Sequence, residues 1–307
     1  MTTISKPVVV VCIPVWNGSG FVAETLASVL AQQAVTMRVH ISIDGPDEAS
    51  RAACKPFLSD DRVSLVMQPA RLGWVRNCAA TLGLAAAPDV DYACIQPHDD
   101  IMEAGYLSTL VAVAQAEPSA AVVYSDMIAF GHGDFDLRQP SAIGSPLSRM
   151  TALLLDHFNA VAFRGLTRMS ALRAVEPMAG NPMNDFAVDT VWMTRLATQG
   201  DLIRVPRTLY RKRYHAGSTH GAWNHWPREQ RIAAWTRHCI DMLREAVKVA
   251  NDSAAVAMLI EAARIRLLGT GGTPLHFQTR PLTATEYAQV SHEFDTVAAQ
   301  LRPNSRL

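Results

Sequence analysis

The sequence predicts an α/β protein with a mostly parallel central sheet, helices on both faces of that sheet, and a helical C-terminal extension. Three observations indicate this class. Short apolar runs rich in β-branched residues alternate with segments of helical spacing through the first 126 residues. Such alternation is typical of parallel strands joined by crossover helices. Turn-forming residues gather where the apolar runs end, and from about residue 226 long helical segments follow.

The elements are expected in the following order. Strands at 8–13, 37–43, 63–67, 92–95 and 120–124 alternate with helices at 21–33, 48–58, 73–87 and 104–116. Residues 130–148 are predicted as loop or irregular hairpin, followed by helices at 150–158, 170–175 and 184–199 and strands at 202–205 and 208–214. Helices at 228–249, 254–268 and 285–301 follow. We therefore expect a catalytic domain over 1–222 and a helical region over 223–307.

Composition limits the classes of function. Of the 307 residues, 49% are hydrophobic, which is enough for a full core. Lys and Arg equal Asp and Glu at 28 each, so the basic excess of a nucleic-acid-binding protein is missing. The five cysteines form no C-x-x-C pair, which fits buried thiols in a reducing, cytoplasmic location. No uninterrupted apolar stretch approaches the roughly 20 residues that span a bilayer, although peripheral membrane association stays open.

Polar residues follow several of the predicted strands. They occupy 14–17, 44–45, 98–100 and 125–126, and three of these four segments contain aspartate. In open α/β sheets the carboxyl ends of the strands form the ligand-binding edge. Clustered carboxylates repel one another unless a cation lies between them, and oxygen ligands suit Mg²⁺ or Mn²⁺. This pattern favours a divalent cation that holds a phosphorylated substrate, although Asp and Asn are also common in plain turns.

Seven motifs together show a resemblance to a known family. In chain order they are VCIPVWNG at 11–18, LASVLAQ at 26–32, IDG at 43–45, RLGWVRN at 71–77, HDDI at 98–101, VDTVWMTRL at 188–196 and YRKRYHAGS at 210–218. They resemble the motifs of family 2 glycosyltransferases, which have the GT-A fold. The resemblance covers about residues 7–220. It implies transfer of a sugar, in the manner of an inverting hexosyltransferase, from a nucleotide-diphosphate donor to an acceptor hydroxyl.

The resemblance also implies roles for individual residues on the donor side. Asp44 would accept hydrogen bonds from the nucleotide base, and Asp99 would bind the Mn²⁺ or Mg²⁺ ion that bridges the phosphates. Further donor contacts are expected at Pro14, Val15, Asn17, Arg71, Arg76 and His98. The basic segment near the end of the domain would clamp the diphosphate through Arg211 and Arg213, with His215 as a metal or phosphate contact. A solvated basic edge strand is the alternative for that segment.

Two positions depart from the family pattern. Pro97 stands where the first acid of the D-x-D motif is usual, and proline has no side-chain ligand. We therefore expect Asp99 to bind the metal with help from His98 or Asp100. Val188 replaces the Glu of the family's E-D pair, whereas Asp189 keeps the position of the general base. Alternatively, Asp189 only complements the dipole of its helix.

Other functions stay open at this point. Gly18-Ser19-Gly20 fits a G-x-G-x-x-A dinucleotide fingerprint, which would make the protein an oxidoreductase. The two departures also allow a catalytically impaired relative that only binds. The acceptor is a glycan, a lipid-linked saccharide or a small molecule. Trp223, His225 and Trp226 would either line an acceptor pocket or pack between domains, and the C-terminal helices would pack on the catalytic domain, form a homodimer or recruit a partner.

Overall fold

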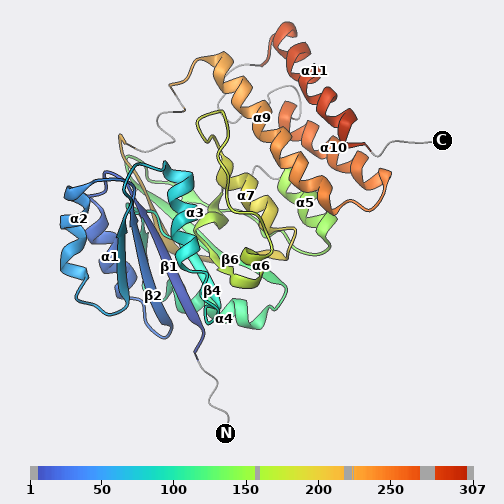
Figure 1. Ribbon diagram of the computed structural model, residues 1–307. Helices are drawn as coiled ribbons and strands as arrows, with labels where there is room; N and C mark the ends of the chain where they lie inside the picture. Colours follow the sequence, from blue (N-terminus) through green and yellow to red (C-terminus); the bar gives the residue numbers. More distant parts are fainter. Residues whose placement is uncertain (1–5, 156–159, 218–222, 224, 270–280, 303–307) are drawn as a thin grey trace.

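A computed structural model describes residues 6–155, 160–217, 223, 225–269 and 281–302. The N-terminal elements form an α/β body, and helices α9, α10 and α11 stack beside α5 and α7 (Figure 1). The strands are β1 (Val8–Val15), β2 (Thr36–Ile43), β3 (Val63–Met67), β4 (Tyr92–Ile95), β5 (Ile101–Met102), β6 (Ala120–Gly131), β7 (Asp136–Leu137), β8 (Leu166–Arg168) and β9 (Asp201–Tyr214). The predicted fold class is confirmed.

Helices surround this sheet and extend beyond it. They are α1 (Val22–Leu30), α2 (Glu48–Cys54), α3 (Trp74–Leu84), α4 (Tyr106–Ala116), α5 (Pro146–Leu155), α6 (Met169–Arg173), α7 (Val188–Leu196), α9 (Arg228–Ala246), α10 (Ser253–Leu268) and α11 (Ala284–Leu301). Short 3₁₀ turns occupy Lys55–Phe57, Val161–Arg164 and Val247–Val249. Within the described ranges, no helix combines the length and the apolar character needed to cross a bilayer.

The nine-stranded sheet has the order β3-β2-β1-β4-β8-β6-β9-β5, with β7 paired to β6. Strands β3, β2, β1 and β4 are mutually parallel, as are the long strands β6 and β9. The short strand β8 joins the two halves through antiparallel pairs with β4 and β6. Because β1, β2 and β4 run side by side in the same direction, their carboxyl ends meet at one edge.

The long strands correct two sequence expectations. Strand β6 runs on to Gly131, so Asp126 lies inside a strand and not at its end. There Asp126 accepts two hydrogen bonds from Arg204, at 2.6 and 2.7 Å. The two strands predicted at 202–205 and 208–214 are one strand, β9, which follows β6 past register shifts near Asp126. The segment 130–148 contains β7 and the start of α5 in addition to loop.

Helix α7 starts later than the sequence predicts. In the segment just before this helix, the backbone φ angle is positive at Asn184, Asp185 and Ala187, with values of 49°, 57° and 50°. Non-glycine residues seldom adopt this left-handed conformation, which is strained. The helix therefore begins at Val188 and places Asp189 in its first turn.

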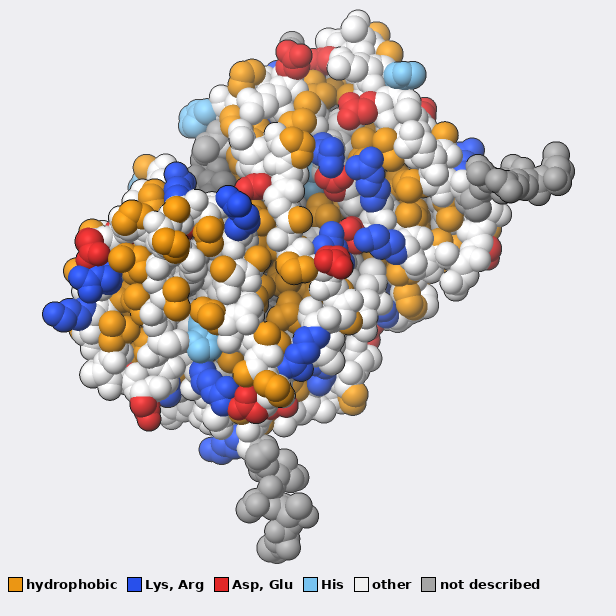
Figure 2. Space-filling model, in the orientation of Figure 1, with side chains coloured by type: hydrophobic (Ala, Val, Ile, Leu, Met, Phe, Trp, Pro, Cys, Tyr) orange, Lys and Arg blue, Asp and Glu red, His pale blue; other side chains and the backbone are white. Residues whose placement is uncertain are grey.

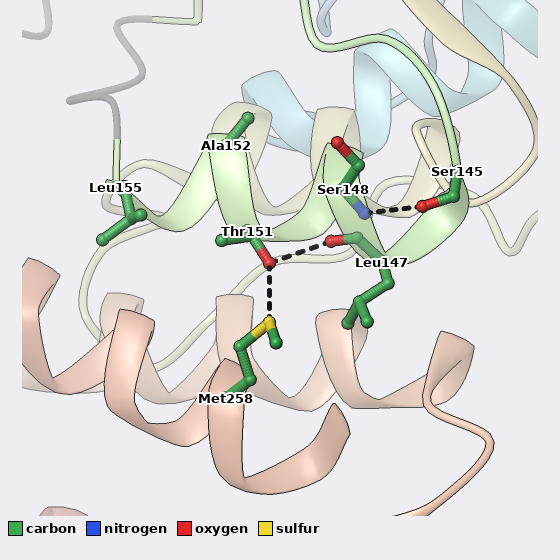
Figure 3. Close-up of a pocket in the computed structure, with 7 residues that line it drawn as sticks. All are labelled: Ser145, Leu147, Ser148, Thr151, Ala152, Leu155 and Met258. Atoms are coloured by element: carbon green, nitrogen blue, oxygen red, sulfur yellow. Dashed lines mark hydrogen bonds between the residues drawn. The ribbon is translucent and has the colours of Figure 1, made fainter. Parts of the chain in front are cut away.

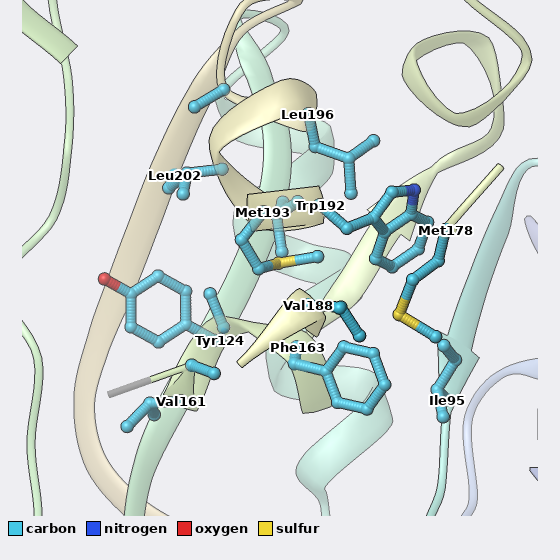
Figure 4. Packing of buried hydrophobic residues seen from close by; sticks show 14 of the residues in the cluster. Ile95, Tyr124, Val161, Phe163, Met178, Val188, Trp192, Met193, Leu196 and Leu202 are labelled. Carbon is cyan, nitrogen blue, oxygen red and sulfur yellow. The ribbon is translucent and has the colours of Figure 1, made fainter. Parts of the chain in front are cut away.

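The interior of α7 is part of the main core. Trp192 and Met193 are 3% and 1% exposed, which confirms the expectation that they are core residues. They pack with Phe163 and Val188 in the cluster that Figure 4 shows. All five cysteines are free and buried, as expected.

The C-terminal helices pack on the α/β body. Helix α9 lies against α7, and α10 lies against α5 and α9. Arg195 on α7 donates to Glu245 on α9 at 2.8 Å. Of the arrangements left open by the sequence, packing on the α/β body is the one observed, and a homodimer through these helices stays a prediction.

A shallow apolar groove of about 470 Å³ lies on the surface between α5 and α10. Met258 contributes one wall, and its sulfur lies 3.9 Å from the Thr151 hydroxyl (Figure 3). The groove is built from elements other than those that carry the strand-end carboxylates.

The core role of Trp192 is testable by substitution. Trp192→Ala should lower the free energy of unfolding by about 3–5 kcal/mol, because it removes a large buried side chain and leaves a cavity. Trp192→Phe should cost under about 1.5 kcal/mol, since the indole N–H has no partner within the described residues. Urea unfolding followed by circular dichroism measures both, with Leu155→Ala, at an exposed position, as the control. Equal losses for the Ala and Phe variants would contradict this view of the core.

Candidate active site

The carboxylates that the sequence singles out lie in one charged region. Burial, followed by the negative charges of Asp189 and Asp44, raises the pKa of the Cys78 thiol to about 12. Burial and the positive charge of Arg164 lower the pKa of Lys212 to about 8, against the opposite effect of Asp100, Asp189 and Asp99. These electrostatic neighbourhoods overlap, so the ends of β2, β4 and β9 and the start of α7 converge.

Asp44 fixes the loop that follows β3. Its side chain is 1% exposed, and its two oxygens accept hydrogen bonds from the backbone N–H groups of Leu72 and Gly73. These groups precede α3, so the carboxylate also stabilises the N-terminus of that helix. Recognition of a base by Asp44 stays a prediction.

The other predicted donor contacts border the same loop. The Arg71 guanidinium lies 4.3 Å from the centre of the Trp16 ring, which forms a flat cation–π surface after β1. Asn17 is exposed with φ of 48°, and its N–H donates to Asp47. Pro14 and Val15 end the strand beneath it. Arg76 is exposed on α3 and bonds to the Leu72 carbonyl, so it has no contact with the carboxylates.

His98 packs against the turn after β1. Its Nδ1 lies 3.2 Å from the carbonyl oxygen of Pro14. A Cβ at Gly18 would come within 2.7 Å of both the His98 ring and Val15, so only glycine fits there. Gly18 thus serves close packing between this turn and the His98 loop.

Asp99 and His215 form a pair from distant parts of the chain. The Nε2 atom of His215 lies 3.0 Å from Oδ2 of Asp99. The Gly217 N–H donates to Nδ1 of the same ring, which places the ring proton on Nε2. Phe21 covers the imidazole at 4.7 Å between ring centres.

In this structure the Asp99–His215 pair is a hydrogen bond, and a divalent metal ion held by the same two atoms would take the place of the Nε2 proton. Two adjacent ligands of an octahedral ion, each at about 2.1 Å, lie about 3 Å apart, which matches the distance between these two atoms. Within the described ranges, no group of three or more His, Cys, Asp or Glu side chains could hold an ion. An ion here would therefore need oxygens from a substrate, as Mg²⁺ sites on phosphorylated substrates do.

Asp100 has a different place from the one the sequence suggests. It is 1% exposed; Arg164 donates to its Oδ2 at 2.7 Å, and the Tyr210 hydroxyl donates to the same oxygen at 3.2 Å. The backbone N–H of Arg213 donates to Oδ1 at 2.8 Å. Burial raises the pKa of Asp100, against the opposing charge of Arg164. Because protein donors occupy both oxygens, the geometry speaks against Asp100 as a metal ligand.

Asp189 is half-buried in the first turn of α7. One of its oxygens accepts a hydrogen bond from the backbone N–H of Thr190 at 2.9 Å. Burial raises its pKa, while the charges of Arg164 and Lys212 oppose that shift. A carboxylate with a raised pKa is a stronger base than an ordinary aspartate, which suits proton abstraction at neutral pH.

The basic side chains at the end of β9 point to two opposite faces of the sheet. Arg211 stacks on Phe130 at 4.5 Å and lies near Glu103. Arg213 donates from Nε to the Asp99 carbonyl at 2.9 Å and pairs with Glu24. Arg213 is thus hydrogen-bonded within the protein, whereas Arg211 has only a half-exposed ion pair at 3.8 Å, and phosphate binding by the two stays a prediction. Lys212, between them, faces the carboxylates instead.

The sequence analysis missed Arg164 and Lys212. The signal for Lys212 was available, because side chains alternate along a strand and Tyr210 and Lys212 must share a face. Arg164 comes from a 3₁₀ turn after Ala160, whose φ is 52°, and no motif marks it.

Comparison with known proteins defines the class and then the family. The fold is that of GT-A glycosyltransferases: the TarS fragment 1–349 from S. aureus in complex with UDP has a TM-score of 0.68 at 12% identity, covering 96% of this chain and 83% of that one. The mannosyltransferase PcManGT from Pyrobaculum calidifontis, in complex with GDP-Man and Mn²⁺, gives 0.53 at 13% identity, with coverage of 97% and 87%. Residues 10–175 match the family described as glycosyl transferase family 2, and the chain belongs to that family. No curated protein sequence matches the chain.

The buried pair of Asp100 and Arg164 gives a direct test of this architecture. Arg164→Met should lower the free energy of unfolding by about 3–5 kcal/mol, because it leaves an unpaired carboxylate in the interior. The loss should grow from pH 5 to pH 8: in the variant the folded-state pKa of Asp100 lies above its unfolded value, so stability falls as pH rises through it. Urea titrations at both pH values measure this.

The double variant Arg164→Met with Asp100→Leu is the matched control. It removes both charges and should recover most of the loss. A double variant as unstable as the single one, with no dependence on pH, would mean that the cost is packing alone.

Proposed function

We propose that this chain transfers a sugar from a nucleoside-diphosphate donor to an acceptor hydroxyl with inversion at the anomeric carbon. The observation that carries the proposal is the convergence of Asp189 with the Asp99–His215 pair around Lys212. Membership of glycosyl transferase family 2 supports the reaction class. Similar structures were solved with UDP, UDP-GlcNAc and GDP-Man, which supports a nucleotide sugar as the donor.

On the donor side, the turn after β1 and the Arg71–Trp16 surface would border the nucleotide. Asp99 and His215 would hold a Mn²⁺ or Mg²⁺ ion together with the two phosphates. Bound there, the ion would neutralise the charge that develops on the leaving diphosphate. Arg213 serves this arrangement indirectly, since it holds the Asp99 backbone in place.

On the acceptor side, Asp189 would act as the general base. It takes the proton of the acceptor hydroxyl while that oxygen forms a bond to the anomeric carbon. The bond from this carbon to the diphosphate oxygen breaks in the same displacement, and its electron pair leaves with the diphosphate. With one base, the reaction is a single displacement. The acceptor oxygen then attacks the anomeric carbon on the face opposite the leaving group, which inverts the configuration.

Two alternative functions, an oxidoreductase and a binding protein without turnover, differ in their support. The oxidoreductase reading loses its basis, because the family is a transferase family and Gly18 packs against His98. A relative that binds donor without turnover stays the second candidate, favoured by Pro97 and Val188. On the face in Figure 2, basic and acidic side chains are interspersed, which agrees with a non-nucleic-acid partner. We propose a glycan, a lipid-linked saccharide or a small molecule as the acceptor.

Metal-dependent donor binding is the first test. UDP or GDP should raise the melting temperature in the presence of Mn²⁺ much more than in its absence, because the ion and the diphosphate share one site. Asp99→Asn and His215→Gln should lose most of this metal-dependent increment. Differential scanning fluorimetry measures it, with NAD as the negative control. A metal-independent response to NAD alone would overturn the proposal.

The role of Asp189 is tested by rate and pH. Asp189→Asn should lower kcat by about 10²- to 10⁴-fold and leave binding of the nucleoside diphosphate unchanged. The base must be ionised to accept a proton, so wild-type kcat should fall as pH drops through the raised pKa of Asp189. That acidic limb should lie above the range of an ordinary aspartate. Initial rates of nucleoside-diphosphate release across pH measure both, and near-normal turnover in the Asn variant would remove Asp189 from the mechanism.

A further inference from the structure

Lys212 is a buried cation without a bonding partner. The residue is 8% exposed, and within the described residues no hydrogen bond or ion pair reaches its ammonium group. Its one close neighbour of note is the Tyr214 ring, whose centre lies 4.9 Å from Nζ. The buried Arg164 differs, because it donates to the carboxylate of Asp100. The Nζ of Lys212 is not among the fully buried polar atoms of the described residues, so solvent reaches the ammonium, but the surrounding protein reduces its hydration in the free state.

The position of Lys212 connects this cost to the active site. Strand alternation puts it on the same face as Tyr210, whose hydroxyl binds Asp100. The charges that act on its pKa are those of Arg164, Asp100, Asp189 and Asp99. Asp100 is already neutralised by Arg164. The ammonium therefore shares an electrostatic neighbourhood with the proposed base and with Asp99, and within the described residues it is hydrogen-bonded to neither.

The balance of charges in the site indicates which ligand group Lys212 would bind. A nucleoside diphosphate brings two to three negative charges, and Asp99 and Asp189 add one each. One divalent ion cannot balance this total in a site with a low local dielectric. Arg211 and Arg213, the other cations at this end of β9, already have protein partners. Among the cations at this end of β9, Lys212 is the one on the carboxylate face of the strand, which makes it the side chain placed to supply positive charge there.

We propose that Lys212 is a catalytic residue that binds the diphosphate of the donor directly, next to the metal ion. This rests on the proposed function, and it assigns to one side chain the stabilisation of the leaving group. It also explains why a lysine is kept at this largely buried position: stability is given up in the free state for an interaction that exists in the complex.

The experiment compares UDP with UMP, or GDP with GMP if the guanine nucleotide is the one that binds. Isothermal titration at fixed Mn²⁺ is run on the wild type and on Lys212→Met. The Met variant should bind the diphosphate about 10- to 100-fold more weakly and the monophosphate within about 3-fold of the wild type, as expected for loss of a charge-assisted bond. Arg207→Met, which removes an exposed cation of β9, should change neither affinity.

Stability separates this role from a structural one. Without ligand, Lys212→Met should melt at the wild-type temperature or above it, because the desolvation cost of a largely buried ammonium is removed. Lys212→Arg should restore part of the diphosphate affinity, and it also serves if the Met variant does not fold. A Met variant that melts lower but binds the diphosphate normally would overturn the proposal.

Two further outcomes are informative. If Lys212→Met binds the diphosphate normally but has a raised KM for the acceptor, the proposal is overturned, and Lys212 contacts the acceptor instead. Wild-type protein that binds no nucleoside diphosphate with metal would remove the proposed function itself. Wild-type binding that the Met variant retains removes the role of Lys212 alone.

Discussion

The buried ion pair between Asp100 and Arg164 is the interaction on which the site depends. It joins the loop after β4 to the 3₁₀ turn before β8, and the Tyr210 hydroxyl and Arg213 N–H add β9 to the same carboxylate. Asp99 is next in the chain to Asp100, and His215 lies two residues after Arg213. Fixing Asp100 therefore fixes both members of the Asp99–His215 pair, which explains why so polar a group is tolerated in the interior.

A second constraint comes from the C-terminal helices. Asp189 lies at the start of a short helix that follows strained backbone, so its position depends on what holds α7. Phe186, just before α7, packs on Trp223 at 4.8 Å and on Trp226 at 6.0 Å between ring centres. The Arg195–Glu245 bond fixes the other end of α7 to α9. The helical region thus acts as a support for the proposed base, and these tryptophans pack between elements.

The sequence predicted the first half of the fold well, because there the apolar runs are short, buried and bounded by turn residues. Strands β1 to β4 and their helices lie within a few residues of the expected limits. It was less successful from residue 125 onward. Asp126 looked like a strand end because polar side chains usually leave the sheet, whereas here Arg204 pairs with it and lets β6 continue. The residues with left-handed backbone before α7 are not glycines, so no signal in the sequence marked the late start of this helix.

The sequence by itself indicated the family, the strands and helices of the first half and the polar residues that follow those strands, since short motifs and hydrophobic periodicity are local properties. Only the tertiary structure decided which of those residues face one another. It paired Asp100 with Arg164 and Asp99 with His215, and it placed Lys212 on the face of β9 that carries these carboxylates. The reason is physical: whether a charged side chain is neutralised by the protein or kept for a ligand depends on neighbours that lie a hundred residues away in the chain.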